Sequence, residues 1–480
     1  MNKKLLTLSS LALTSFAATA QNDKNVLFIL VDDMQLTALE KLGDKTPGSK
    51  VINELMANST KFSNCYTQGS LGGALSMPSR AMIMTGRTLY ETTADGMTIR
   101  PHNVTIPETL RKEGYRTFAT GKWHSDYKSF NRSFSEGENI YFGGMHQYST
   151  GGHQAPYLKH YQSDTLYNKQ KSFVGDKFSS EMFADATVDF LKSAGKNKEN
   201  PFFAYVAFTS PHDPHDKLPE YSSPTSDEIV TLPENFAPQH AFDNGELSVR
   251  DETVVPAPRT KEIVIEQNQW YSGMINEVGQ QIGRLLDELK NQGLDENTII
   301  VFASDNGLAM GRHGLMGKQS LYEHSISVPM SIYIPGNKPK VNDGLCYLSD
   351  INPTLYSLLE VEKPESVTTE VLPMKGTKTN RNAIALSYSS IQRAVVWKNF
   401  KYIIYKVNGV ITKQLFDLNN DPFEMNNLAV NKKYGKMVTQ YHDKLNAMMK
   451  LNGDFCDLDK LNWWKDGHMI NWNEAMTLVK

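Results

Sequence analysis

Four apolar segments of this 480-residue chain are each followed directly by side chains that can bind ions or move protons. These side chains stand in four runs: Asp32-Asp33, Gly121-Lys122-Trp123-His124, Ser210-Pro211-His212-Asp213-Pro214-His215 and Asp305-Asn306-Gly307. Carboxylate and amide oxygens are ligands for hard cations, and imidazole titrates near neutral pH. One such run is equally compatible with solvated turn residues. Four runs at one edge of a sheet indicate a functional site.

The elements that must position these groups are predicted from apolar patterning. We predict strands at Val26–Val31, Arg116–Thr120, Phe202–Phe208 and Thr298–Ala303, three of which are nearly continuous apolar runs, as in strands buried on both faces. Helical patterns lie between them at Val51–Asn58, Ile106–Lys112, Glu181–Ser193 and Glu262–Lys290. This alternation predicts an α/β fold with a mostly parallel sheet, whose ligands bind beyond the carboxyl ends of the strands.

Two long segments with weak periodicity, Ser125–Phe178 and Ser222–Arg259, are predicted to be surface insertions that wall a pocket. Near residue 375 the pattern changes to short strands and one amphipathic helix. The expected elements are Ala383–Tyr388, Arg393–Trp397, Lys401–Lys406, Thr412–Asp417 and the helix Tyr434–Lys450. We therefore predict a catalytic domain over residues 21–375 and a C-terminal α+β subdomain over residues 376–480.

The N-terminus resembles a secretory signal peptide over residues 1–20. Lys3 and Lys4 precede the apolar stretch Leu5–Ala17, and Ala18-Thr19-Ala20 forms a small-x-small cleavage site. A buried N-terminal helix is the alternative. The apolar stretch is too short to span a bilayer, which needs ~20 residues, and no later segment approaches that length. We expect a periplasmic or secreted protein without a membrane span.

Composition narrows the class of protein further. The chain is 40% hydrophobic, and its net charge of −3 gives no reason to expect a nucleic-acid partner. Cys65, Cys346 and Cys456 are scattered and odd in number, so we do not expect a disulfide framework, although one chance pair remains possible.

Residues 76 to 86 read S-M-P-S-R-A-M-I-M-T-G. Pro78 suits the first turn of a helix, where its missing N–H costs nothing. Ser76 then lies at the positive end of that helix, which favours negative charge, with Arg80 close by. On helix logic alone, Ser76 could equally be an ordinary N-cap serine.

This segment resembles the signature of formylglycine-dependent sulfatases, Cys or Ser-x-Pro-x-Arg followed at fixed distance by Thr-Gly. Ser76, Pro78, Arg80, Thr85 and Gly86 all fall in register. The resemblance continues from Asn25 to about Leu428, through V-D-D, G-K-W-H, S-P-H-D-P-H, S-D-N-G, G-K-Q-S-L-Y-E-H and L-F-D-L-N-N-D-P-F-E-M-N-N-L. It implies the alkaline-phosphatase-like α/β sandwich with a smaller C-terminal subdomain.

In that family the leading residue is oxidised to formylglycine, and a leading serine implies a radical-SAM maturase that acts before export. A serine hydroxyl is a weak nucleophile and would leave a stable sulfate ester. A hydrated aldehyde avoids this, because one oxygen attacks sulfur and the other, once deprotonated, expels sulfate.

The resemblance also assigns roles to individual residues. It implies a calcium ion held by Asp32, Asp33, Asp305, Asn306 and the modified Ser76; Mg²⁺ is an alternative, but crowded carboxylates favour calcium. Arg80 and Lys122 match the family's partners for the formylglycine oxygens, and Lys318 matches its second sulfate-binding lysine. His124 matches the histidine that deprotonates the hydrate, and His212 the one that binds sulfate and helps protonate the leaving oxygen. Without the resemblance, a surface lysine or structural histidine would be the ordinary interpretation.

The expected substrate is a sulfated carbohydrate cleaved by an exo-acting enzyme, with a galactose-type sugar as the hypothesis within that class. Candidates for contacting the sugar are His215, His313, Gln392 and Arg393. Two other functions stay open: a phosphatase or phosphonate monoester hydrolase of the same superfamily, and an unmodified, non-catalytic glycan-binding relative.

Overall fold

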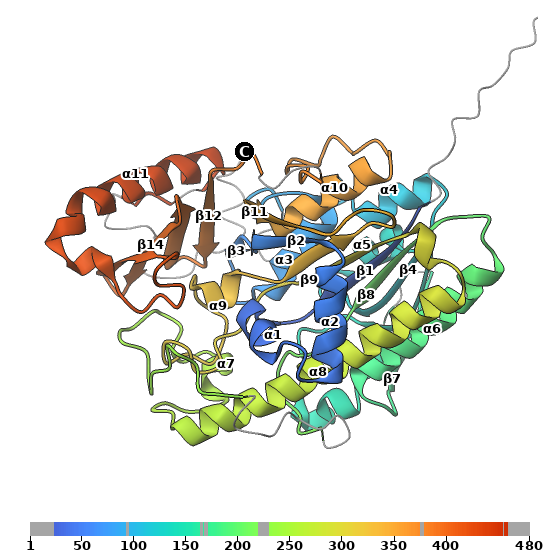
Figure 1. Cartoon of the computed structure of the whole chain (residues 1–480), viewed down its shortest axis with the longest axis horizontal. Coiled ribbons are helices and arrows are strands. Elements are labelled where there is room, and N and C mark those ends of the chain that lie inside the picture. Colours follow the sequence, from blue (N-terminus) through green and yellow to red (C-terminus); the bar gives the residue numbers. More distant parts are fainter. Residues whose placement is uncertain are drawn as a thin grey trace, which may run out of the picture.

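The computed structural model of the chain describes residues 24–92, 96–163, 167, 171–218, 230–374, 379–454 and 456–458. Two sheets organise these residues, one of ten strands and one of five (Figure 1). This α/β architecture, with a large, mostly parallel central sheet and a smaller C-terminal sheet, confirms the predicted fold class. The predicted signal peptide lies outside the described residues. Within the described ranges, no helix has the length and apolarity to cross a membrane.

The four predicted strands form the middle of the central sheet. They are β9 (Thr298–Ser304), β1 (Asn25–Val31), β8 (Phe202–Ala207) and β4 (Arg116–Lys122), in that spatial order and all parallel. All seven residues of β1 are buried, as its continuous apolar run predicts. Because these strands are parallel neighbours, the four polar runs that follow them emerge at the same edge.

Helices cover both faces of this sheet (Figure 1). The sheet therefore separates two layers of hydrophobic core. Leu27, Ile29 and Val31 of β1 pack toward α2 (Pro47–Ala57), α6 (Ser179–Lys196) and α8 (Lys261–Asn291), together with α1 (Leu36–Leu42). The alternate residues, Val26, Phe28 and Leu30, share a core with α3 (Ser76–Thr85), α4 (Ile106–Lys112), α5 (Tyr127–Ser133) and α10 (Ile351–Leu358). The four predicted helices all form, within about one turn of the predicted ends.

The outer strands of the central sheet show where periodicity fails as a signal. The insertion predicted from Ser125 contains β5 (Glu136–Tyr141), β6 (Tyr157–Lys159) and β7 (Ser172–Val174), which extend the sheet beyond β4. The strands are short, and β5 begins with the half-buried residues Glu136, Gly137 and Glu138, so no alternation marks them. On the other side, β10 (Met330–Tyr333), β2 (Thr60–Tyr66) and β11 (Lys340–Tyr347) follow β9.

The smaller sheet contains the predicted C-terminal strands together with a short strand from the N-terminal half. Its order is β15 (Val410–Asp417), β14 (Phe400–Val407), β13 (Gln392–Trp397), β12 (Ala383–Tyr388) and β3 (Gly69–Ser70). β3 pairs in parallel with β12 only a few residues before Ser76, so this sheet is joined directly to the segment that leads into α3. The helix α11 (Gly435–Leu451) packs on β13 and β14. The domain boundary near residue 375 stays a prediction.

The three cysteines are buried and free. Cys65 and Cys346 face each other as register partners on β2 and β11. The structure therefore agrees with the expectation that no disulfide framework holds the fold.

Gly121, beside Lys122 at the end of β4, provides a test of how tightly this edge is packed. A Cβ at Gly121 would lie 2.0 Å from the Ala207 carbonyl oxygen of β8, and its φ is +82°. Gly409 has nearly the same φ, +80°, with nothing within 4 Å of such a Cβ. Both alanine variants incur left-handed backbone strain of about 1–2 kcal/mol, but only Gly121→Ala adds a backbone clash. We expect Gly121→Ala to lower the free energy of unfolding by at least ~2 kcal/mol more than Gly409→Ala.

Urea denaturation of the two variants and the wild type measures this difference. Equal losses in the two variants would show that β4 and β8 can separate without cost at this point.

Candidate active site

The polar runs predicted from the sequence converge at the carboxyl edge of β1, β4, β8 and β9. Asp32-Asp33 follow β1, Lys122 ends β4, and Asp305-Asn306 follow β9. These five side chains are at most 1% exposed. A buried group of this many charges is stable only if the charges are paired and hydrogen-bonded.

Ser76 is the first residue of α3, and its side chain faces the acidic groups. Its hydroxyl lies 3.2 Å from Asp32 Oδ1 and 3.0 Å from Asn306 Oδ1. The capping position is occupied by Leu75, and no side chain caps the helix. The alternative reading of Ser76 as an N-cap serine is therefore wrong, because its hydroxyl bonds across the site instead of to its own helix.

Three cations neutralise three carboxylates in one connected network, in which Arg80 also approaches Asp32 at 3.6 Å. Arg80 Nε donates to Asp305 Oδ2 at 2.8 Å, Lys122 Nζ to Asp32 Oδ2 at 2.5 Å, and Lys318 Nζ to both oxygens of Asp33 at 2.7 Å. Arg80 also donates to the Lys122 carbonyl oxygen at 2.9 Å, which links α3 to the end of β4. The result is a compact, preorganised array of charge.

The pairing sets the protonation states of these groups. Burial disfavours the charged form of Asp32, but Lys122 and Arg80 outweigh it and hold the pKa of that carboxyl well below its usual value. For Lys318, burial is likewise outweighed, mainly by Asp33, and the pKa is raised. Burial, reinforced by the negative charge of Asp32, raises the pKa of Asp305 to about 6. The charged form of Asp305 is thus less stabilised than that of Asp32.

The pKa values of His212 and His124 are shifted in opposite directions. His212 lies in the turn after β8, with Nε2 3.6 Å from Asp33 Oδ2 and Nδ1 3.0 Å from Asp213 Oδ1. Burial alone would lower its pKa, but Asp33 outweighs that effect and raises it, so His212 favours the cation. Burial and the nearby charges of Lys122 and Arg80 hold the pKa of His124 well below its usual value. His124 is therefore neutral near pH 7 and able to accept a proton.

The backbone is strained at two of these residues. Asp33 and His124 have φ values of 64° and 63°. Residues other than glycine rarely adopt this left-handed conformation, and it persists only where the surroundings enforce it. At Asp33 the enforcing contacts include the bonds of its carboxylate to Lys318 and Asn306.

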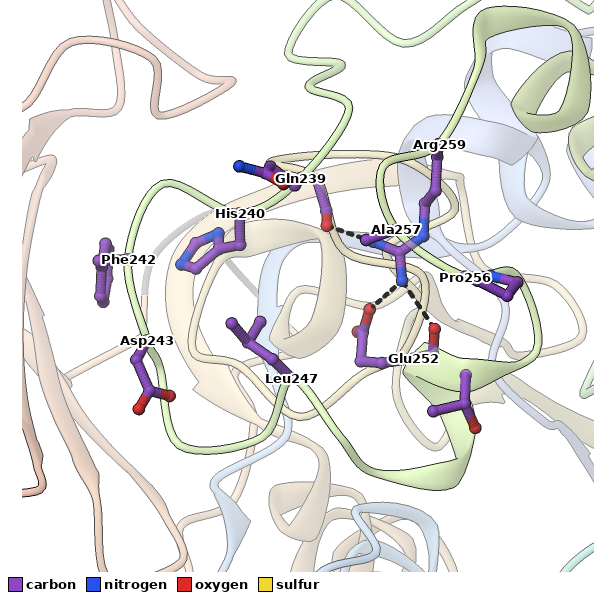
Figure 2. Close-up of a pocket in the computed structure, with 11 residues that line it drawn as sticks. Gln239, His240, Phe242, Asp243, Leu247, Glu252, Pro256, Ala257 and Arg259 are labelled. Atoms are coloured by element: carbon purple, nitrogen blue, oxygen red, sulfur yellow. Dashed lines mark hydrogen bonds and ion pairs between the residues drawn. The ribbon is translucent and has the colours of Figure 1, made fainter.

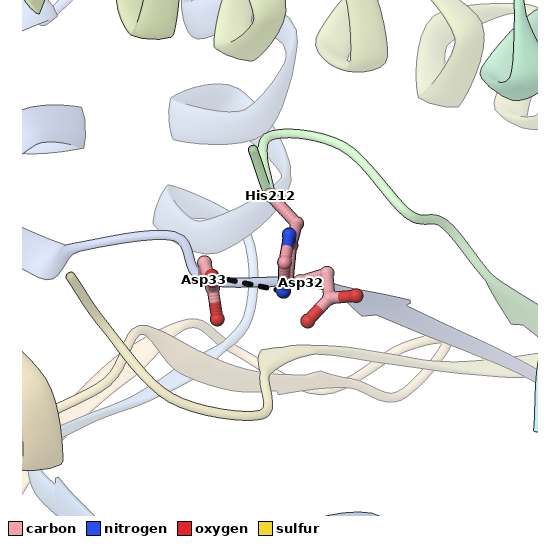
Figure 3. A group of neighbouring side chains, drawn as sticks. All are labelled: Asp32, Asp33 and His212. Carbon is pink, nitrogen blue, oxygen red and sulfur yellow. Dashed lines mark ion pairs between the residues drawn. The ribbon is translucent and has the colours of Figure 1, made fainter. Parts of the chain in front are cut away.

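The oxygen-rich part of the site could hold a metal ion. Ligand atoms of Asp32, Asp33 and His212 lie within 4.8 Å of one another (Figure 3). Oxygens of Asp32 and Asn306 both approach the Ser76 hydroxyl, so hard donors from β1, β9 and α3 point to one place. Burial raises the pKa of Asp305, so its charged form is less stabilised than that of Asp32 and would be favoured by a bound cation. The donor set fits a hard divalent cation.

Lys318 is positioned by residues that bind the backbone just before it. The Glu252 carboxylate, from α7 (Arg250–Thr253), accepts hydrogen bonds from the Met316 and Gly317 N–H groups at 2.9 and 2.8 Å. Arg259 clamps Glu252 in turn, at 2.8 Å. Figure 2 shows this pair on the wall of a separate cavity. The other side chains of α7 point elsewhere: Arg250 pairs with Asp213, and Asp251 accepts from Gln319 at 2.7 Å.

The four residues predicted to touch a sugar all have structural partners. His215 packs edge-on against Tyr271, and His313 stacks on Tyr322 at 4.1 Å. The Gln392 side chain bonds to the backbone of Gln319 and Leu321, at 3.2 Å in each case, and so braces the segment that carries Lys318. Arg393 is fully buried in an ion pair with Asp454 at 2.6 Å. Sugar contact by these four residues stays a prediction.

Sequence reasoning missed several residues that support the site. Asp213 could have been singled out, because it adjoins His212 in the same run. The Tyr205 hydroxyl lies 3.4 Å from Arg80 Nη1. In the sequence, Tyr205 is one more aromatic residue of the buried strand β8, and nothing marks it as polar support. Arg250 and Glu252 lie in an insertion without periodicity, far from their partners in sequence. No pattern in the sequence marks these last contacts.

Comparisons with known proteins agree with this geometry. The sequence model of the sulfatase family matches residues 24–361, and a model described as N-sulphoglucosamine sulphohydrolase, C-terminal, matches residues 311–451. An arylsulfatase of Clostridium perfringens is 29% identical over 458 residues, covering 86% of this chain and 92% of its own. An N-acetylglucosamine-6-O-sulfatase of Bacteroides thetaiotaomicron is 24% identical over 512 residues, covering 90% and 88%.

A solved structure of a protein in complex with its substrate, D-glucosamine-2-N,6-O-disulfate, superposes with a TM-score of 0.70 at 21% identity. It covers 92% of this chain and 99% of its own, so the two proteins share the overall fold. The family match spans well over half of the sequence and includes every strand that delivers a charged group to the site. The chain therefore belongs to the sulfatase family, the sulfuric ester hydrolases.

Proposed function

We propose that this sulfatase removes sulfate from sulfated carbohydrates in an exo-acting manner, with a formylglycine made from Ser76 and a bound calcium ion. The observation that carries the proposal is the position of the Ser76 hydroxyl between Asp32 and Asn306, at the start of a buried helix. Arg80, Lys122 and Lys318 bring positive charge to the carboxylates of the same site. A nucleophile held among fixed cations suits an anionic ester.

The chain's own residues have chemistry that fits separate tasks. Lys122, Lys318 and a cationic His212 would hold the sulfate oxygens, and their fixed positions would stabilise charge without reorganisation. His212 would also give a proton to the departing oxygen. His124, neutral at pH 7, would take the proton from the nucleophile. Formylglycine at position 76 would supply a hydrated aldehyde that both attacks sulfur and lets sulfate leave.

Calcium would be held by Asp32, Asp33, Asp305, Asn306 and the oxygen of residue 76. Members of the sulfatase family generally use formylglycine and a divalent metal. A bound divalent cation would polarise the sulfate and stabilise the charged form of Asp305, which burial disfavours. Crowded carboxylates favour Ca²⁺ over Mg²⁺, which retains several waters.

A carbohydrate substrate is supported by the relatives. The relative from Bacteroides thetaiotaomicron is named for a sulfated amino sugar, and the superposed structure holds a disulfated glucosamine. We extend this class to the present chain and propose a galactose-type ring within it. We also propose export to the periplasm or beyond, after modification by a radical-SAM maturase.

The first prediction tests the reaction class against a phosphatase or phosphonate monoester hydrolase. Purified enzyme, matured in its native host, is assayed on a panel of defined sulfated sugars and on matched nitrophenyl sulfate and phosphate esters. We expect kcat/KM for the nitrophenyl sulfate to exceed that for the phosphate by ~100-fold or more, because the phosphate dianion brings one more negative charge close to the buried carboxylates. A higher rate on the phosphate would reassign the enzyme.

The second prediction concerns the nucleophile. In active protein, the peptide containing position 76 should have lost two hydrogens relative to serine and should react with aldehyde reagents. Ser76→Ala should abolish turnover and leave the melting temperature nearly unchanged, because the hydroxyl bonds only within the site. Peptide mass spectrometry that finds only serine in fully active enzyme would falsify the modification.

The third prediction concerns the metal. Asp305→Asn should remove bound calcium and lower kcat by at least ~100-fold, because a negative ligand is lost. Asp350→Asn is the matched control: Asp350 is equally buried and paired with an arginine, Arg381, outside the site. Elemental analysis measures metal content and enzyme assays measure kcat. Metal-free, chelator-treated wild type that keeps its full rate would rule out this assignment.

A further inference from the structure

Tyr148 carries an aromatic ring that is both exposed and fixed. It opens the short helix η1 (Tyr148–Thr150) and is 64% exposed. Its hydroxyl nevertheless donates to the His215 carbonyl oxygen at 3.2 Å. A ring tethered in this way has already lost much of its rotamer freedom, so contact with a ligand costs little further entropy.

The segment around Tyr148 is fastened to the turn that follows β8. His153, in η2 (Gly152–Gln154), is fully buried and lies 3.0 Å from the His212 carbonyl oxygen through Nε2. Its Nδ1 lies 2.9 Å from the Ser179 hydroxyl. Tyr148 and His153 thus attach the segment to both ends of the turn from His212 to His215, which makes the exposed ring a rigid feature.

The ring lies beside the catalytic turn. A Cβ at Gly152 would lie 3.6 Å from Pro214 Cγ, 3.7 Å from Asp216 Oδ2 and 3.8 Å from Tyr148 Cδ1. Tyr148 therefore neighbours the Pro214–Asp216 end of the turn whose first residue, His212, approaches Asp33. Burial raises the pKa of Tyr148, and the charges of Asp216 and Asp213 raise it further, so both carboxylates act on its hydroxyl.

The same turn carries a fixed polar pair. Arg250 reaches from α7 to the Asp213 carboxylate and also contacts Asp251 at 2.6 Å, while its own side chain is 44% exposed. A guanidinium held by two carboxylates can offer its remaining N–H groups in a defined direction. An aromatic face and oriented hydrogen-bonding groups around one turn are the features that sugar sites combine.

We propose that Tyr148 is the platform on which the sugar ring of the substrate stacks, with the Arg250–Asp213 pair bonding sugar hydroxyls. This inference rests on the proposed carbohydrate function and adds the residues that select the sugar. The ligand class is a pyranose with an apolar C–H face. Galactose-type rings have such a face, because the axial 4-hydroxyl points away from it. The ring would contribute to substrate binding and not to the reaction at sulfur.

The test compares Tyr148→Ala and Tyr148→Phe with the control Tyr157→Ala. Tyr157, on β6 in the same insertion, is 49% exposed, and no hydrogen bond or ring contact joins it to the turn among the described residues. Matured holoenzymes are assayed on the sulfated sugar that wild type turns over best, with kcat and KM measured separately. Melting temperatures are recorded for all variants.

We expect Tyr148→Ala to raise KM about tenfold or more, with kcat within about twofold of wild type and an unchanged melting temperature. Tyr148→Phe keeps the ring and should restore most of the affinity, whereas Tyr157→Ala should match wild type. If Tyr148→Ala changes kcat and stability without a selective rise in KM, the platform is wrong and the residue is structural. If the KM of Tyr148→Ala equals that of the wild-type enzyme, only the stacking role of Tyr148 is wrong. If the wild-type enzyme hydrolyses no sulfated sugar, the proposed carbohydrate function is wrong as well.

Discussion

Burial of alternating charges at one sheet edge is the constraint on which the rest of the structure depends. Asp32, Asp33 and Asp305 are fully buried, and each is neutralised by at least one cation from another element. An unpaired carboxylate in this position would cost several kcal/mol. Because the cations come from α3, β4 and the segment after β9, these elements must meet in one arrangement for the site to be stable. The arrangement of these charges and the packing of the sheet edge therefore depend on each other.

Close backbone contacts and local backbone strain accompany these buried charges at the sheet edge. A side chain at Gly121 would collide with β8, and one at Gly307 would lie 2.1 Å from the His324 carbonyl oxygen. These glycines adjoin Lys122 and Asn306. Asp33 and His124 accept left-handed backbone angles that their surroundings must enforce. Both strained residues carry side chains of the candidate site. At this edge, the placement of these side chains is therefore maintained at the cost of an unfavourable backbone conformation.

The insertions and the smaller sheet supply the support that the central sheet lacks. Glu252 and Gln392 both bond to the backbone near Lys318, one from α7 and the other from β13. β3 joins the C-terminal sheet to the segment before Ser76. The second sheet therefore braces the segment of Lys318 and the segment that leads to Ser76, which explains why Gln392 is buried instead of facing solvent. Around the turn after β8, by contrast, the side chains of Tyr148 and Arg250 remain exposed.

The sequence by itself determined the central strands, the main helices and the groups at their ends, because continuous apolar runs and helical periodicity are local signals. The Ser76 motif singled out the candidate nucleophile, and its register implied partners that the structure brings close to it. Only the tertiary structure decided which contacts support them. β3 and β5 have no alternation, and Glu252 meets Gly317 across 65 residues of chain. The ring of Tyr148 became a distinct feature only when the fold tethered it to His215 while leaving it exposed. Such contacts depend on close packing between elements distant in sequence, and no local pattern of residues records them.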